Sequence, residues 1–492
     1  MVQLLGENMT IQELLILSPI MFLALGALIA ILLEITTRNV SHVIYVSIVF
    51  LILSFLASMN LWNGWTNTPI GSPILGESFS VDHFALFFYF LIIPVGAATL
   101  LMMKTLLDKM DFDRGEMIIL LLLSLTGMMA LVSSRDLLAI YVSLELASLP
   151  LIALGAIRKN GYALEVGVKF LVMSSVSTAT LLYGFIILYG LTGSTNLDQI
   201  LYELKNMDSL TPALMFSIVA IIAGFGFKMS LVPWQSWVPD FYQGAPVIVV
   251  AFVSVASKAA AFAVVVRIFL LAMNHDGVIQ YWIAIFAVIS ALTMIVGNLI
   301  ALRQTSFKRL LGYSSISQAG YMLIGIASIS TGSLGLVGLL YYLAGYAFTN
   351  LTVFFTYGAI LSKSDNDEIY LLKGLLQKSP LIAVSMVIAF LSLIGMPATV
   401  GFMGKLFVFS SAVDSGILWL AILGGISTVV GAFYYLRVIK TIVFDTPESD
   451  PEFSIDKVGI SIQLIGAIGI LFFGIFPSFL IHLSKTAIES LM

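Results

Sequence analysis

Long apolar stretches recur along the whole sequence, and this recurrence restricts the possible folds more than any other feature. Each stretch has roughly 16–30 residues, which is enough for a helix to cross a hydrocarbon layer about 30 Å thick. Only 10% of the 492 residues are charged, whereas roughly a quarter of the residues in a soluble domain are charged. The sequence therefore predicts a chain that is solvated mainly by lipid.

The apolar stretches predict an all-α polytopic membrane protein with about fourteen transmembrane helices. The alternation of apolar and polar residues that marks a membrane β-barrel does not occur. The first stretch is too long for the core of a signal peptide, so we expect a retained helix. Only residues 133–136 separate the fourth and fifth spans, which predicts a tight helical hairpin. The expected spans are 11–34, 42–62, 84–104, 117–132, 135–157, 162–191, 211–237, 246–272, 279–301, 309–329, 333–361, 380–412, 416–439 and 458–482.

The basic residues are distributed unevenly between the two sides of this predicted bundle. Of the 23 lysines and arginines, fifteen lie in loops after odd-numbered spans and four lie on the opposite side. Under the positive-inside rule, this asymmetry predicts that both termini are on the non-cytoplasmic side of a cell inner (plasma) membrane. There is no basic run to neutralise a row of phosphates, so nucleic acid is not an expected partner. The remaining four basic residues are inside spans: Lys169, Lys228, Lys258 and Lys405.

Two of the expected spans are interrupted by glycine and proline next to a lysine. Residues 224–233 contain Lys228, and residues 395–405 contain Lys405. Proline removes a backbone hydrogen bond, and such a break in a membrane helix is tolerated where it lines a cavity. The two breaks are five spans apart, an odd number, which predicts two inverted repeats with a transport site at mid-membrane. The alternative is that glycine and proline are simply frequent in membrane helices.

The repeats divide the chain into four expected parts. Spans 4–8 and 9–13 would be the two five-helix units, each with one broken helix. The parts are an N-terminal three-helix segment (1–116), a first repeat (117–272), a second, inverted repeat (273–440) and a C-terminal helix (441–492).

Glu145 and Lys258 lie near the centres of the fifth and eighth spans. A charged side chain at the bilayer centre costs at least about 2.5–3.5 kcal/mol, so it is either paired for structure or kept for transport. Burial disfavours the charged forms of both side chains, and an opposite charge nearby favours them. A glutamate–lysine contact that forms and breaks could therefore load and release a proton, whereas a static pair would only fix helix packing. We expect a proton relay of Glu145, Lys228, Lys258 and Lys405.

Other polar residues of the spans have two interpretations each. Lys169 follows Glu165 by one helical turn, so the two charges can neutralise each other locally or belong to a relay. Asp240 is expected at a water boundary, as a solvated or capping group. Arg267 is expected to extend its guanidinium to the membrane surface. The hydroxyl groups between residues 174 and 180 can hold a chain of waters or bond back to their own helix.

The chain has no cysteine and only four histidines. The lack of cysteine excludes disulfides, thiolate-bound iron–sulfur clusters and Cys-ligated zinc within this chain. All four histidines fall at expected helix ends or in loops, so neither a metal nor a haem is expected in the membrane core. Any redox chemistry would belong to a partner protein.

Several of these segments together resemble the antiporter-like subunits of respiratory complex I, which are related to Mrp antiporters. The resemblance runs over nearly the whole chain and is strongest from about residue 135 to 440. Its motifs are residues 226–233, 237–246, 257–260, 307–316 and 395–405. Within the family, the run Pro-Asp-Phe-Tyr-Gln-Gly-Ala-Pro at 239–246 resembles the subunit N branch, the counterpart of mitochondrial subunit 2. Subunits L and M and the sodium/proton antiporter subunits usually carry Pro-Asp-Ala-His there.

Two further features agree with the subunit N branch. A basic residue in the twelfth span, Lys405, fits this branch better than subunit M, where a glutamate is usual. The sequence ends soon after the last span, so we expect no long lateral helix like that of subunit L.

The resemblance implies a role for each buried charge. Glu145 would pair with Lys228 and modulate its proton affinity, Lys258 would be the central relay, and Lys405 would belong to the second half-channel. Many relatives carry histidine where this sequence has Gln235 and Gln318. Glutamine cannot hold an extra proton, so these two positions could only orient water.

The resemblance also implies cofactors and partners. Quinone and iron–sulfur clusters would be in partner subunits, and the immediate neighbours would be K-like and M-like membrane subunits and the lipid bilayer. Two other functions stay open on the sequence alone: an Mrp-type sodium/proton antiporter subunit, and a scaffold that has kept the fold without pumping. The electron donor, which could be NADH, reduced ferredoxin or reduced F420, also stays open.

Overall fold

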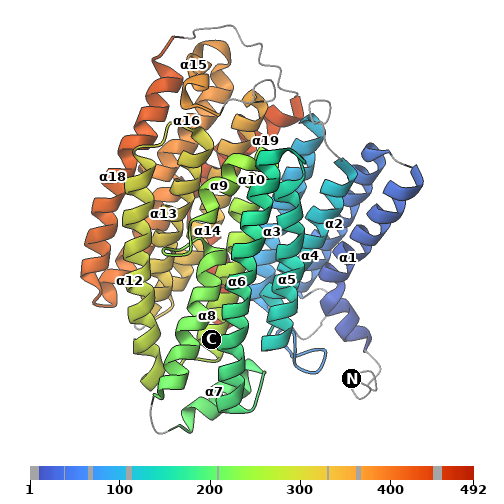
Figure 1. The fold of residues 1–492 in the computed structure, drawn as a ribbon, viewed down its shortest axis with the longest axis vertical. Helices are drawn as coiled ribbons and strands as arrows, with labels where there is room; N and C mark the ends of the chain where they lie inside the picture. The colour runs from blue at the N-terminus through green and yellow to red at the C-terminus, as the bar shows by residue number, and fades with distance from the viewer. Residues whose placement is uncertain are drawn as a thin grey trace.

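The computed structural model describes residues 10–37, 39–64, 70–106, 114–207, 210–329, 332–361, 367–446 and 457–492. Within these ranges the backbone forms helices, with isolated bridges between a few extended residues. The long helices run side by side along the longest axis of the molecule (Figure 1). This arrangement agrees with the predicted all-α bundle.

The helices of the described residues cover most of each range. Their bounds are α1 (Ile11–Thr37), α2 (Val40–Asn63), α3 (His83–Leu106), α4 (Arg114–Ser133), α5 (Leu137–Ala156), α6 (Gly161–Thr192), α7 (Leu197–Lys205), α8 (Pro212–Met229), α9 (Trp237–Gly244), α10 (Val247–Phe252), the π-helical segment η3 (Val253–Ser257), α11 (Lys258–Leu271), α12 (Asp276–Ala301), α13 (Phe307–Ala327), α14 (Leu334–Leu361), the 3-10 helix η5 (Ile369–Leu372), α15 (Leu375–Lys378), α16 (Pro380–Ile394), α17 (Val400–Asp414), α18 (Leu418–Val443), α19 (Lys457–Ile475) and α20 (Ser478–Glu489).

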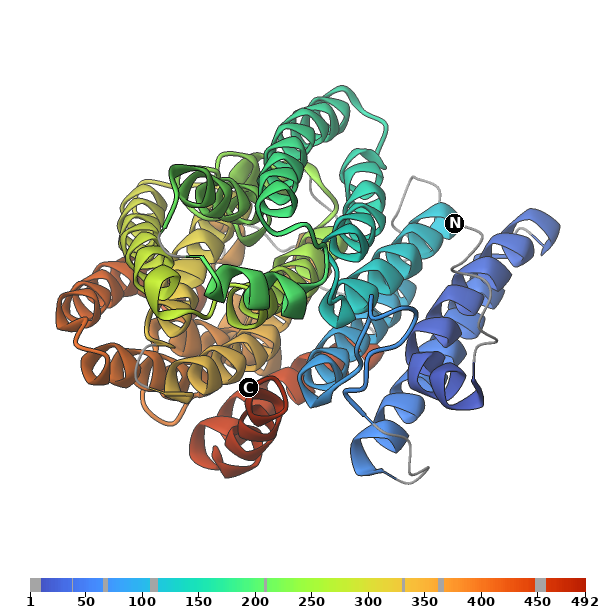
Figure 2. The same ribbon diagram turned by 90° about the horizontal axis from the view of Figure 1, so that it is seen from below.

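Many helices in the described ranges are apolar enough to cross a membrane. Eleven meet this condition by length and composition when α10, η3 and α11 count as one, and the bent pair α19–α20 would be a twelfth. The chain is therefore an all-helical, multi-pass membrane protein. Seen from below, the N-terminal helices lie at one side of the bundle and α18 at the other (Figure 2).

Short polar side chains set several helix starts. Asn160 accepts a hydrogen bond from the amide of Ala163 at the start of α6. Ser306 accepts one from the amide of Arg309 at the start of α13. Such caps satisfy amide groups that have no partner within their own helix, and in a lipid environment those groups would otherwise be costly to bury.

The last predicted span differs from the structure. Residues 458–482 were expected to be one helix, but α19 ends at Ile475 and α20 begins at Ser478, with the two axes bent by 81°. Pro477 lies at the break, and proline has no amide hydrogen to continue the helical ladder. The bend lets α20 pack against both α3 and α14.

A second difference is α7, which lies in a stretch that was expected to be a loop. Asn196 caps it by accepting hydrogen bonds from the amides of Asp198 and Gln199. Its apolar side chains Leu197, Ile200 and Leu204 are buried, while its other face is polar. This short amphipathic helix is too polar for a span, which is why hydropathy alone did not predict it.

The predicted hairpin of α4 and α5 is confirmed and is very tightly packed. Asp136 caps α5 through the amides of Leu138 and Ala139. Ser124 in α4 donates a hydrogen bond to the carbonyl of Ala147 in α5 at 2.7 Å. A methyl group added to Gly127 would lie 2.3 Å from the backbone nitrogen of Ala147. Glycine at this position therefore lets the two backbones touch.

We expect Gly127→Ala to destabilise the chain by about 1–3 kcal/mol, because the clashing atoms belong to backbone and cannot rotate away. The matched control is Gly190→Ala in α6, where an added methyl group meets no atom within 4 Å. The measurement is the thermal unfolding midpoint and the amount of chain in the membrane. Equal midpoints for the two variants would contradict the packing described for this hairpin.

Candidate functional site

Three of the lysines predicted inside spans are buried in the bundle. Lys228, Lys258 and Lys405 are 7%, 2% and 5% exposed. Each lies where a helix is irregular: near the end of α8, directly after the π-helical segment η3, and shortly after the break between α16 and α17. Irregular backbone inside a membrane protein is found where it lines polar sites.

Lys228 is held by serines from two neighbouring helices. Its Nζ donates hydrogen bonds to Ser148 Oγ of α5 and Ser174 Oγ of α6, both at 2.8 Å. Helix α8 ends one residue later, and Ser230 follows it in the left-handed region with a φ of 67°. Of the hydroxyl cluster 174–180, Ser174 is thus the member that contacts the lysine, whereas Ser175, Thr178 and Thr180 bond back to their own helix.

Glu145 lies close to this lysine along α5 but does not touch it. It is half-buried, and it precedes Ser148 by three residues, which is about one helical turn. Among the ion pairs of the described residues, none involves Glu145. The implied pairing of Glu145 with Lys228 is therefore not a direct contact in this structure, where Ser148 and Ser174 take the ammonium instead.

Lys258 is held by a single residue of the second predicted repeat. Its Nζ donates to the carbonyl oxygen of Ser315 at 2.7 Å and to Ser315 Oγ at 2.6 Å. Tyr242 of α9 donates its hydroxyl to the same Oγ at 2.9 Å. One turn before the lysine, Asn350 of α14 donates to Ser254 Oγ at 2.6 Å. Polar contacts therefore join η3 and α11 to α13 and α14, and Tyr242 of α9 holds the serine that accepts from Lys258.

Lys405 binds the broken end of α16. Gly395 ends this helix with a φ of 89°, a conformation that favours glycine. The Nζ of Lys405 donates to the carbonyls of Leu393 at 3.0 Å and Ile394 at 2.9 Å. It also lies 4.6 Å from the centre of the Tyr321 ring. The C-terminal end of a helix carries partial negative charge, so the broken helix forms a site for a cation from backbone alone.

Polar side chains of α13 and its neighbours connect the surroundings of Lys258 with those of Lys405. Ser314, next to Ser315, is hydrogen bonded to the hydroxyl of Tyr435. Gln318 Nε2 donates to Tyr435 and to the carbonyl of Leu393, at 3.2 Å each. Leu393 thus accepts from both Gln318 and Lys405. Gln318 also accepts a hydrogen bond from Tyr342.

The other glutamine singled out in the sequence is not part of this network. Gln235 follows the end of α8, and its Oε1 is buried without a hydrogen-bond partner in the described part of the protein. Gln318 and Gln235 therefore differ in the structure, since Gln318 belongs to the polar network and Gln235 does not, although the sequence analysis gave both the same role.

Lys169 and Glu165 lie apart from the three buried lysines. Lys169 Nζ is 2.7 Å from Glu165 and 3.7 Å from Asp240, and its side chain is 50% exposed. The structure contains the local pairing within α6 that was one of the two interpretations, and the relay role of Lys169 stays a prediction. Asp240 was expected to be solvated or capping, but it also binds Arg309 of α13 at 2.8 Å. The ion pairs join α6, α9 and α13.

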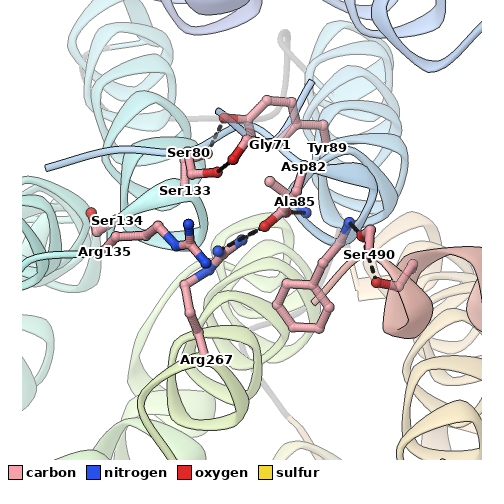
Figure 3. Close-up of polar contacts among 12 residues, drawn as sticks. Gly71, Ser80, Asp82, Ala85, Tyr89, Ser133, Ser134, Arg135, Arg267 and Ser490 are labelled. Carbon is pink, nitrogen blue, oxygen red and sulfur yellow. Dashed lines mark hydrogen bonds and ion pairs between the residues drawn. The ribbon is translucent and has the colours of Figure 1, made fainter. Parts of the chain in front are cut away.

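Arg267 is not at the surface, contrary to the prediction. It is fully buried, and its two terminal nitrogens donate to the two carboxylate oxygens of Asp82 at 2.9 and 2.8 Å (Figure 3). Asp82 also caps α3 by accepting from the amide of Ala85 at 2.8 Å. The prediction failed because the partner is 185 residues away along the chain, so no local pattern indicates it.

Several polar residues of these sites were missed by the sequence analysis. Ser315, Tyr242, Asn350 and Asp82 each contact a residue far away in the sequence. Ser148 had an indirect signal, because it lies on the same helical face as Glu145. Ser315 and Tyr242 lie within the motifs 307–316 and 237–246 but had no role assigned to them, and Asn350 and Asp82 had no local signal.

Comparison with known proteins gives consistent results. Residues 134–431 match the family model described as NADH:quinone oxidoreductase/Mrp antiporter, TM. The chain is similar to NADH-quinone oxidoreductase subunit N of Heliobacterium modesticaldum, with 38% identity over 84% of this chain and 86% of the relative. It is also similar to subunit N of Dehalococcoides mccartyi, with 32% identity over 96% of this chain and 98% of the relative.

Solved structures agree. A chain of respiratory complex I from Thermus thermophilus with bound aureothin has a TM-score of 0.79 and 30% identity, covering 94% of this chain and 98% of that one. A chain of the Mrp complex from Dietzia sp. DQ12-45-1b has a TM-score of 0.86 and 21% identity, with 98% of both chains covered. The second likeness concerns the fold alone.

Proposed function

Because the chain belongs to the NADH:quinone oxidoreductase/Mrp antiporter family of transmembrane proteins, we propose that it is the proton-translocating subunit N of a complex I-type NADH:quinone oxidoreductase. The observation that carries the proposal is the set of three buried lysines at irregular points of their helices. Buried ionisable groups in a membrane protein are expensive, so they are either paired or kept for function. None of the ion pairs of the described residues involves these three lysines, which favours transport.

The relay consists of Lys228, Lys258 and Lys405, with Glu145 next to the first. Each lysine donates to oxygen atoms of a neighbouring helix or helix end. Protonation adds a donor and a charge, so a change of protonation at one lysine changes the contacts between helices. A wave of such changes, with half-channels opening alternately, would move protons across the membrane. The polar chain through Gln318 supports transfer between Lys258 and Lys405.

The membrane arrangement has fourteen spans in two inverted repeats. To the eleven apolar helices we add α13, the broken pair α16–α17 and the bent pair α19–α20. The N-terminal segment would contain α1–α3, the first repeat α4–α11, the second repeat α12–α18, and the remainder α19–α20. Lysines near the breaks of α8 and α16–α17, five spans apart, support this division. The start of α1, the end of α20 and α7 lie toward one end of the bundle (Figure 1), as an even number of spans requires, and the uneven distribution of basic residues would make that end the non-cytoplasmic side.

The driving energy would come from other subunits, since the chain lacks cysteine for an iron–sulfur cluster. Quinone and the redox centres would be in those partners. The charged pair Lys169 and Glu165 is about half exposed although it lies within α6. Lipid would solvate these charges poorly, so a K-like or M-like membrane subunit next to α6 would explain them.

Substituting Lys228 tests the proposed function. In the whole complex, reconstituted into vesicles, Lys228→Ala is expected to lower proton uptake coupled to quinone reduction by at least about tenfold, as for loss of a proton-transfer group. Uptake is followed with a pH-sensitive dye. The matched control is Lys205→Ala in α7, a lysine at the exposed end of that helix. Normal coupled uptake in Lys228→Ala, in a fully assembled complex, would count against the assignment.

A further inference from the structure

The buried pair of Asp82 and Arg267 lies outside the proposed relay, yet it holds the helix on which the central lysine lies. We propose that Asp82 and Arg267 are positioning residues for Lys258, through which the N-terminal segment controls the geometry of the relay. The inference rests on the proposed function, because it concerns the lysine to which that function assigns the central proton transfer.

The geometry of the Asp82–Arg267 pair restricts how α3 and α11 can move relative to each other. Arg267 is fully buried and the side chain of Asp82 is 5% exposed. Both carboxylate oxygens are bound, each by a different guanidinium nitrogen, and one of them also accepts the amide of Ala85. Bidentate contacts of this kind fix direction as well as distance. The start of α3 therefore cannot slide along α11 without separating two buried charges.

The pair acts on the opposite side of α11 from the lysine. Nine residues separate Lys258 from Arg267, which is about 180° around the helix and about 13.5 Å along it. On one side Lys258 binds Ser315 of α13, and on the other Arg267 binds Asp82 at the start of α3. The helix is thus held between α13 and α3. A shift at the Asp82 end would move the lysine relative to its two acceptors on Ser315.

Further contacts attach the pair to distant parts of the chain. Ser490, just after α20, accepts a hydrogen bond from the amide of Phe84 at 3.1 Å. Tyr89 of α3 is hydrogen bonded to Ser133 at the end of α4. Figure 3 shows these residues around the same end of α3. The N-terminal segment and the C-terminal helix, both outside the two proposed repeats, therefore converge on the contact that holds α11.

The test uses the whole complex in vesicles and measures protons translocated per quinone reduced. We expect Asp82→Asn to lower this ratio at least about twofold, the smaller end of effects seen for residues that act through others. The charge exchange Asp82→Arg with Arg267→Asp should restore at least part of the lost ratio. Asp82→Glu keeps the negative charge but makes the side chain one methylene longer, which changes the geometry of the contact. The ratio should therefore fall in this variant too, which gives a second test if Asp82→Asn assembles poorly.

The matched control is Asp136→Asn. Asp136 also caps a helix, but the side chain that binds its carboxylate is Thr195 rather than an arginine. A purely structural role would reduce the amount of assembled complex and leave the ratio of the assembled fraction unchanged. That result in both Asp82 variants, or an equal fall in Asp136→Asn, would overturn the inference. Wild-type complex without coupled proton uptake would instead overturn the proposed function.

Discussion

Replacing Lys258 by alanine is expected to abolish coupled proton translocation while the complex still assembles. The substitution removes the ionisable group to which the proposal assigns the central proton transfer of the relay. Its loss should lower translocation by about 100-fold or more, the range for loss of a positioned acid–base group. Alanine suits this helix, whose next residues are Ala259 and Ala260, and Ser315 keeps its contact with Tyr242. The measurement is proton uptake against quinone reduction in vesicles.

Lys258→Arg separates charge from proton transfer. Arginine keeps a positive charge near Ser315 but does not release its proton under physiological conditions. We therefore expect assembly as in the wild type and translocation as low as in Lys258→Ala. Lys485→Ala, an exposed lysine of α20, serves as the neutral control. Translocation by Lys258→Arg at the wild-type rate would mean that this site does not exchange a proton.

The largest loss of stability is expected for Arg267→Ala. The substitution leaves the carboxylate of Asp82 buried without its partner, and breaking a buried ion pair in this way costs about 3–5 kcal/mol. It also removes a large side chain from a fully buried position. The thermal midpoint of the chain should fall steeply, and much less of it should be found in the membrane.

Two further variants identify the cause. Asp82→Asn combined with Arg267→Met removes both charges, so it should be more stable than Arg267→Ala alone. Arg437→Ala removes an exposed arginine whose hydrogen bonds within the described residues go to backbone carbonyls, and its effect should be within about 0.5–1 kcal/mol. If Arg267→Ala were as stable as Arg437→Ala, the buried pair would not hold the fold together.

Much of this architecture could be predicted from the sequence because its signals are local. Apolar length indicates spans, and glycine and proline beside a lysine indicated the breaks near Lys228 and Lys405. Lys169 and Glu165 can pair because one helical turn separates them. In each case the residues that determine the feature are neighbours in the chain, so their spacing carries the information.

The contacts that complete the site could not be predicted in this way. Ser315 reaches Lys258 from 57 residues away, and Asp82 reaches Arg267 from 185 residues away. Arg267 was therefore taken for a surface residue, since a lone arginine near a helix end usually extends to water. Pro477 was visible in the sequence, but whether a proline kinks a helix or ends it depends on what packs against it.

The acceptors of Lys405 have a consequence for mutational studies of this half of the molecule. They are main-chain oxygens of Leu393 and Ile394, so no side-chain substitution deletes them. A systematic alanine scan would identify Lys405 but would not identify the main-chain oxygens that it binds. Those oxygens also restrict the chemical identity of position 405, since an acidic side chain would face like charge there. A glutamate at 405 could bind these oxygens only in its protonated form, whose hydroxyl can donate, so the break favours a side chain that carries a proton there.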